Sequence, residues 1–287
     1  MTLVSAEQVR RNIRNLVTFV GGESAAAETS RRTYFDSLNQ MQKYEISFDP
    51  DSTEPLLDFA LDDPRTCAIM GSLMRSPEID DVGVIKKVGQ DQIPARLRGL
   101  QSGRELLQQY DRETANIVGD LIAQIIVVSA EGYCGGSFWH ILGAIWMSPS
   151  SNWNATDYAE NLLHETVHQA MFLEDMVNGL FAESPAELAC ASAQITSSIR
   201  GTKRPYDYSF HAATVSVALI DFHERVGVQS RAAELCQPTL ATLAELAERK
   251  HLLSPRGAQI LWQMVNLMNS TTTFKALCGS VQASAGQ

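Results

Sequence analysis

Apolar residues recur at intervals of three and four along most of this chain, which is the spacing of one face of an α-helix. Between such stretches, residues 76–98 are polar and rich in turn-forming residues, and Pro64 is expected to break the stretch in which it lies. Ser24, after Gly21-Gly22, is a possible cap for the second helix. The predicted helices are 5–19, 25–44, 54–75, 102–122, 185–198, 208–226, 231–249 and 254–269.

Two short segments have a different pattern. Residues 125–128 (IIVV) form a β-branched run that ends before Glu131-Gly132, and residues 143–147 (GAIWM) also have the composition of a strand. We therefore expect an α+β fold that is predominantly helical, with a small sheet ahead of a helix that follows residue 150. We expect an N-terminal helical region over residues 1–120 and a catalytic region over residues 121–287, together in one compact unit.

The helix that follows the predicted strands carries the most informative motif of the chain. Asp157 and Glu160 are spaced as an N-cap and its reciprocal partner, and no Gly or Pro follows until Gly179. Residues 164–168 read HETVH, an HExxH motif. Because positions four apart lie one above the other on a helix, His164 and His168 can both reach a single divalent ion. We expect this helix and the sheet ahead of it to form a zincin-like core.

Two imidazoles leave a metal ion under-coordinated, so a third protein ligand is expected from elsewhere in the fold. Glu187 is one candidate, because a carboxylate 18 residues beyond His168 suits the gluzincin type of metallopeptidase. His211 is the preferred candidate, because the preceding loop carries Arg200 and Arg204 and so presents fixed positive charge to an anion.

The segment that surrounds these residues, SIRGTKRPYDYSFHA at 198–212, resembles the signature loop of the HExxH-motif peptide-modification proteins of ribosomal peptide natural-product clusters. The GAIWM segment at 143–147 resembles the strand that precedes the motif in that family. Some members are iron(II)- and 2-oxoglutarate-dependent peptide β-hydroxylases. The resemblance covers roughly residues 138–226.

The resemblance implies a role for each matching residue. It makes His164, His168 and His211 the metal ligands, and it makes Arg204 or Arg200 the partner of a 2-oxoglutarate carboxylate. Glu165 then supports the site by orienting a ligand or a bound water. The expected substrate is a side chain of a ribosomally made precursor peptide.

Two other functions use the same residues. With zinc in place of iron, Glu165 is the general base of a metallopeptidase, and Tyr206, Tyr208 or His223 stabilises the oxyanion. His223 is otherwise expected to be an exposed residue beside Glu224. In the third alternative the motif is silent and the helical body is a peptide-binding protein, for which the segment 133–139 offers aromatic residues.

Composition narrows the possible partners. The 287 residues are 45% hydrophobic and carry a net charge of −10, which disfavours nucleic acid because a phosphate backbone requires clustered Lys and Arg. No apolar run approaches the length of a membrane span, and the N-terminus has no apolar signal core, so we expect a cytoplasmic protein. Five widely separated cysteines are expected to be reduced core residues: Cys67, Cys134, Cys190, Cys236 and Cys278.

Overall fold

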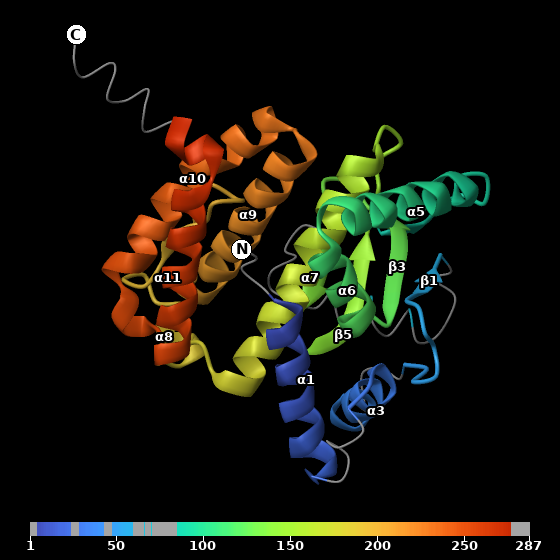
Figure 1. Ribbon diagram of the computed structural model, residues 1–287, viewed down its shortest axis with the longest axis horizontal. Helices are drawn as coiled ribbons and strands as arrows, with labels where there is room; N and C mark the ends of the chain where they lie inside the picture. Colours follow the sequence, from blue (N-terminus) through green and yellow to red (C-terminus); the bar gives the residue numbers. More distant parts are fainter. Residues whose placement is uncertain are drawn as a thin grey trace. The chain divides into compact units, whose positions relative to one another are not determined.

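The protein is predominantly helical with a small mixed sheet, which confirms the expected α+β class (Figure 1). The computed structural model describes residues 5–23, 29–42, 48–59, 66, 70 and 85–276. Contacts divide the chain into two compact units, one of residues 4–173 and one formed mainly by residues 174–287. The division lies inside the helix α7 (Ala155–Asn178). The boundary that we placed near residue 120 lies within the first of these units.

The first unit begins with two helices that lie beside each other, α1 (Ala6–Gly21) and α3 (Arg31–Met41) (Figure 1). The Ser5 hydroxyl caps α1 by accepting the N–H of Gln8, and Ser30 caps α3 in a reciprocal capping box with Thr33. The helix predicted over residues 5–19 is therefore confirmed, and the one predicted over 25–44 is confirmed from Arg31 to Met41. The candidate cap Ser24 lies outside the described residues.

Two further helices follow, α5 (Ile93–Tyr110) and α6 (Arg112–Leu121). The turn-rich prediction for residues 76–98 is wrong at its end, because Pro94 stands in the first turn of α5, where its missing N–H costs nothing. The single helix predicted over 102–122 is interrupted at Asp111, whose carboxylate accepts the N–H of Thr114 and starts α6.

The sheet consists of β1 (Leu56–Asp58), β2 (Lys86–Lys87), β3 (Gln124–Ser129), β4 (Gly135–Phe138) and β5 (Ile141–Met147). Its strand order is β1-β3-β5-β4, and β2 pairs with the C-terminal end of β3. Strands β3 and β5 are parallel and almost wholly buried, which explains their continuous apolar sequences. The expected sheet ahead of α7 is thus confirmed.

Strand β1 replaces the start of the helix predicted over residues 54–75, whereas the described residues Thr66 and Met70 are helical. Leu57 pairs in parallel with Ile125, so this segment extends the sheet beside β3. The apolar spacing that favours a helix is outweighed by hydrogen bonds to a neighbouring strand, which no local pattern reveals. Most of the remaining residues of that stretch lie outside the described part of the chain.

The second unit is a group of helices around the apolar α9 (Tyr206–Val226) (Figure 1). The helices predicted over 208–226, 231–249 and 254–269 are confirmed, but the one over 185–198 is wrong. It reduces to the single turn α8, and Ile195 pairs instead with Arg204 in a two-stranded ladder. The elements are α8 (Pro185–Leu188), β6 (Ile195–Thr196), β7 (Lys203–Arg204), α9 (Tyr206–Val226), α10 (Gln229–Glu248), η1 (Lys250–Leu252) and α11 (Pro255–Ser270).

The cysteines differ from the prediction of core residues at two positions. Cys134 and Cys190 are exposed, whereas Cys236 is buried. Cys67 and Cys278 lie outside the described residues. None of the described helices is long and apolar enough to cross a membrane.

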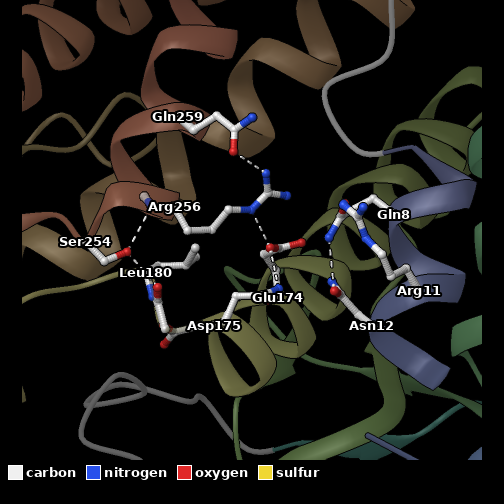
Figure 2. A network of polar contacts seen from close by, with 12 residues as sticks. Gln8, Arg11, Asn12, Glu174, Asp175, Leu180, Ser254, Arg256 and Gln259 are labelled. Atoms are coloured by element: carbon white, nitrogen blue, oxygen red, sulfur yellow. Dashed lines mark hydrogen bonds and ion pairs between the residues drawn. The ribbon is translucent and has the colours of Figure 1, made fainter. Parts of the chain in front are cut away.

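A buried ion pair links the end of α7 to the start of α11 (Figure 2). The Arg256 guanidinium donates to the Glu174 carboxylate over 2.6 Å, and the Asn178 amide donates to the same oxygen over 2.7 Å. Arg256 also donates to Gln259 over 2.8 Å. Because the Glu174 side chain is only 5% exposed, water cannot replace its partners easily.

We predict that Glu174→Ala lowers the free energy of unfolding by about 2 kcal/mol, because it leaves the partly buried Arg256 without its carboxylate. The matched control is Glu234→Ala, which removes an exposed partner of Arg231 and should cost less than about 0.5 kcal/mol. Urea unfolding of the two variants measures the difference. Equal losses would show that the Glu174 pair is no stronger than a surface pair.

Candidate metal centre

Helix α7 positions the HExxH motif, and its start is fixed by a reciprocal cap. The Asn154 side chain accepts the N–H groups of Thr156 and Asp157, at 2.7 and 3.3 Å. Asp157 in turn accepts the Asn154 N–H at 2.7 Å. The predicted cap was therefore wrong by three residues, because Asp157 is the inner partner of the box. The helical prediction for the motif itself is confirmed.

His164 and His168 lie together on one face of α7. Their ring centroids are 5.0 Å apart with planes inclined by 57°, and the His168 ring stacks on Phe172 at 5.8 Å. Both residues are half-buried, and the His164 side chain is 24% exposed. Two imidazole nitrogens presented side by side on an accessible helix face are suitable as two ligands of one transition-metal ion.

Glu165 has a different environment from the histidines that flank it. Its side chain is only 3% exposed, and Oε1 lies 3.8 Å from Nε2 of His164. Within the described residues, Oε2 has no hydrogen-bond partner. Burial raises the pKa of this carboxyl to about 8, and the Ser137 hydroxyl opposes the rise. The carboxyl therefore faces the protein interior beside a histidine rather than the half-exposed face.

Glu165 belongs to a polar stripe that the sequence analysis missed. Asn161, Glu165 and Gln169 stand four residues apart along α7, are buried, and face the sheet. A Cβ at Gly135 of β4 would lie 2.8 Å from the Asn161 side-chain oxygen, so the strand approaches the helix closely there. The spacing of three polar residues at positions i, i+4 and i+8, which places them on one side of a helix, was a signal available in the sequence.

The preferred third ligand, His211, is in the first turns of α9 and belongs to the other unit. Its residue is 7% exposed, and its ring centroid is 6.4 Å from that of Phe181. Burial lowers the pKa of this imidazole to about 4. The ring is therefore neutral near pH 7, which is the protonation state that a metal ligand requires.

The alternative third ligand, Glu187, is an exposed residue of α8. It completes a capping box with Ser184, whose backbone N–H and hydroxyl donate to its carboxylate at 2.9 and 2.6 Å. These hydrogen bonds lower the pKa of Glu187. The carboxylate thus has the ordinary role of an acid at a helix start.

The candidate anion-binding arginines are Arg200, in the turn before the short strand β7, and Arg204, the second residue of that strand. Arg200 is exposed, while Arg204 is half-buried with its guanidinium 5.3 Å from the centroid of the Tyr208 ring. The contact with an aromatic face orients the Arg204 side chain.

Two of the proposed oxyanion donors have other roles in the structure. Tyr206 is fully buried and donates its hydroxyl proton to the Leu246 carbonyl at 3.0 Å. His223 is 1% exposed, so its expected surface position is wrong. Because α9 is buried on most of its surface, a His beside Glu224 and Arg225 still faces the interior.

Among the described residues, no group of three or more His, Cys, Asp or Glu side chains is gathered so as to hold a metal ion. Within its own unit, the candidate metal site is thus limited to the two imidazoles of His164 and His168 among the described residues.

Neither models of known protein families nor curated protein sequences gave a match to the chain.

We predict that Gly135→Ala weakens the packing of β4 on α7. The new methyl group would lie 2.7 Å from the Trp146 carbonyl oxygen and 2.8 Å from Asn161, and such overpacking costs about 1–3 kcal/mol. The control is Gly119→Ala in α6, which meets no atom within 4 Å and should stabilise the helix by up to about 1 kcal/mol. Thermal unfolding of both variants is the measurement, and an unchanged Gly135→Ala variant would contradict the close approach.

Proposed function

We propose that this chain is a metal-dependent peptide-modifying enzyme in which His164 and His168 hold the metal ion. The observation that carries the proposal is the imidazole pair, whose ring centroids lie 5.0 Å apart on a half-exposed helix face. Two histidines at positions i and i+4 of a helix, with a glutamate beside the first, are the pattern by which a helix binds a divalent metal ion. A helix that is capped at its start and packed along its length holds the pair in place.

The specific form of the proposal is iron(II)- and 2-oxoglutarate-dependent β-hydroxylation of a side chain in a ribosomally made precursor peptide. It is supported by the resemblance of residues 198–212 to the loop of such enzymes. When bound, iron with 2-oxoglutarate would supply the oxidising chemistry, in which one atom of O₂ enters the substrate C–H bond, the other enters succinate, and CO₂ is released.

The burial of Glu165 favours this form over zinc peptide hydrolysis. A general base of a peptidase must take a proton from a metal-bound water that shares the cleft with the substrate. The Glu165 side chain is 3% exposed and lies 3.8 Å from His164, so it is better placed to support that ligand than to contact solvent. In the proposed enzyme, Glu165 orients His164.

The remaining roles come from the second unit. His211 is proposed as the third metal ligand, with a buried and neutral imidazole. Arg204 or Arg200 is proposed to pair with the far carboxylate of 2-oxoglutarate, because a guanidinium binds a carboxylate through two parallel hydrogen bonds. Of the two, we favour Arg204, because its contact with Tyr208 already restricts the orientation of its guanidinium. Binding of a carboxylate then costs less side-chain conformational entropy.

A zincin-like core is part of this proposal. It is supported by the position of α7, which packs on a mixed sheet through Gly135 and Gly143. It is also supported by the strand order, in which the edge strand β4 runs antiparallel to β5.

The decisive experiment is an anaerobic titration of the metal-free chain with iron(II) and 2-oxoglutarate. We expect the visible charge-transfer absorption of the chelated cofactor in the wild type and its loss in His164→Ala and in His168→Ala. His251→Ala is the control, because His251 is an exposed residue of η1. Absence of iron binding by the wild type would contradict the proposal. Zinc-dependent peptide cleavage that Glu165→Gln abolishes would establish the peptidase instead.

The third ligand is tested by the same titration on His211→Gln and Glu187→Gln. We expect His211→Gln to weaken iron binding at least about tenfold and Glu187→Gln to leave it unchanged, because Glu187 is engaged in the cap with Ser184. The opposite result would identify Glu187 as the ligand. Circular dichroism of both variants controls for loss of folding.

A further inference from the structure

Two buried glutamines from two different helices hold the beginning of β5. Gln42, which ends α3, accepts the N–H of Leu142 at 2.6 Å and donates to its carbonyl at 3.1 Å. Gln169, on α7, accepts the N–H of Gly143 at 2.8 Å. Its amide also donates to the carbonyls of Ala144 and Ile141, at 3.3 and 3.4 Å.

The strand needs these partners because its backbone is irregular there. Gly143 has φ of +91°, and the pairing of β4 with β5 shifts register between Ser137 and Phe138. A side chain at Gly143 would also collide with the ring of Phe48, since a Cβ would lie 2.8 Å from it. Buried N–H and carbonyl groups that leave the regular ladder must find other partners, and the two glutamine amides provide them.

The two glutamines differ in what else they fix. Gln42 joins β5 to the end of α3, whereas Gln169 joins β5 to the metal-motif helix at the residue next to His168. Gln169 is 1% exposed and lies one turn beyond Glu165 on the same stripe. Successive residues of an α-helix are about 100° apart around its axis. The hydrogen bonds between the Gln169 side chain and the β5 backbone therefore fix the rotation of α7 about its axis, and with it the side of the helix on which the imidazoles lie.

We propose that Gln169 is a positioning residue of the metal centre. Its side-chain amide sets the rotation of α7 against β5, and this rotation keeps Glu165 inside while His164 and His168 share the half-exposed face. The inference rests on the proposed function, in which these two histidines hold a metal ion. It assigns Gln169 no contact with the metal.

Cobalt(II) is a suitable probe, because its visible absorption reports the geometry of its ligands. We expect Gln169→Leu to shift the cobalt bands of the full-length chain and to weaken cobalt binding about tenfold, as loss of a supporting contact does at other metal sites. Gln42→Leu is the matched control, because it removes two hydrogen bonds from the same strand. It should lower the melting temperature by a similar amount and leave the cobalt spectrum unchanged.

Gln169→Glu is the second variant for the case in which Gln169→Leu does not fold. It keeps the oxygen that accepts from Gly143 and should shift the same bands by a smaller amount. A wild-type spectrum and affinity in both Gln169 variants would overturn the inference, as would an equal spectral change in Gln42→Leu. A wild-type chain that binds no cobalt would overturn the proposed function itself, and the inference with it.

Discussion

The packing of α7 against β5 is the contact on which the first unit and its candidate site depend. The strand is completely buried, yet its first residues leave the regular ladder at Gly143, where φ is positive. An unsatisfied amide in this position would cost about 1–3 kcal/mol. Gln169 removes that cost and at the same time fixes the helix that carries the HExxH motif.

Because α7 packs against β5 in this orientation, each of its faces has a different environment. Leu162 and Leu163 pack into the core, and the stripe of Asn161, Glu165 and Gln169 faces the sheet. The half-buried imidazoles occupy the remaining face. One helix of 24 residues thus meets three requirements. It packs into the core, it satisfies the backbone amides of the strand, and it presents the metal-binding nitrogens. A change in the helix rotation would disturb all three together.

The structure also distinguishes residues that look equivalent in the sequence. Glu165 and Glu187 are both glutamates to which the sequence gives a possible role at the metal site. Glu165 is buried beside His164, whereas Glu187 is exposed and belongs to a helix cap. Tyr206 and Tyr208 are two residues apart at the start of α9, yet Tyr206 is bound to a carbonyl while Tyr208 lies against Arg204. These differences follow from burial and partners rather than from residue type.

Sequence reasoning succeeded where local pattern and tertiary packing agree, as in the strands β3 and β5 and the helices α9 to α11. It failed where a segment is defined by a distant partner. Residues 56–58 form a strand because β3 lies beside them, and Ile195 pairs with Arg204 where a helix was predicted. Its expectation for His223 failed for a related reason, because the side of a helix that is covered depends on the neighbouring elements.

The sequence by itself determined the spacing of His164 and His168, and helical geometry alone then places their rings on one side of α7. It also determined the α+β class, because apolar periodicity is a local property. Only the tertiary structure decided that Glu165 faces inward, and that Gln169 replaces a missing strand partner at Gly143. Those outcomes depend on which backbone groups a buried strand leaves unpaired, and that is settled by contacts between segments far apart in the chain.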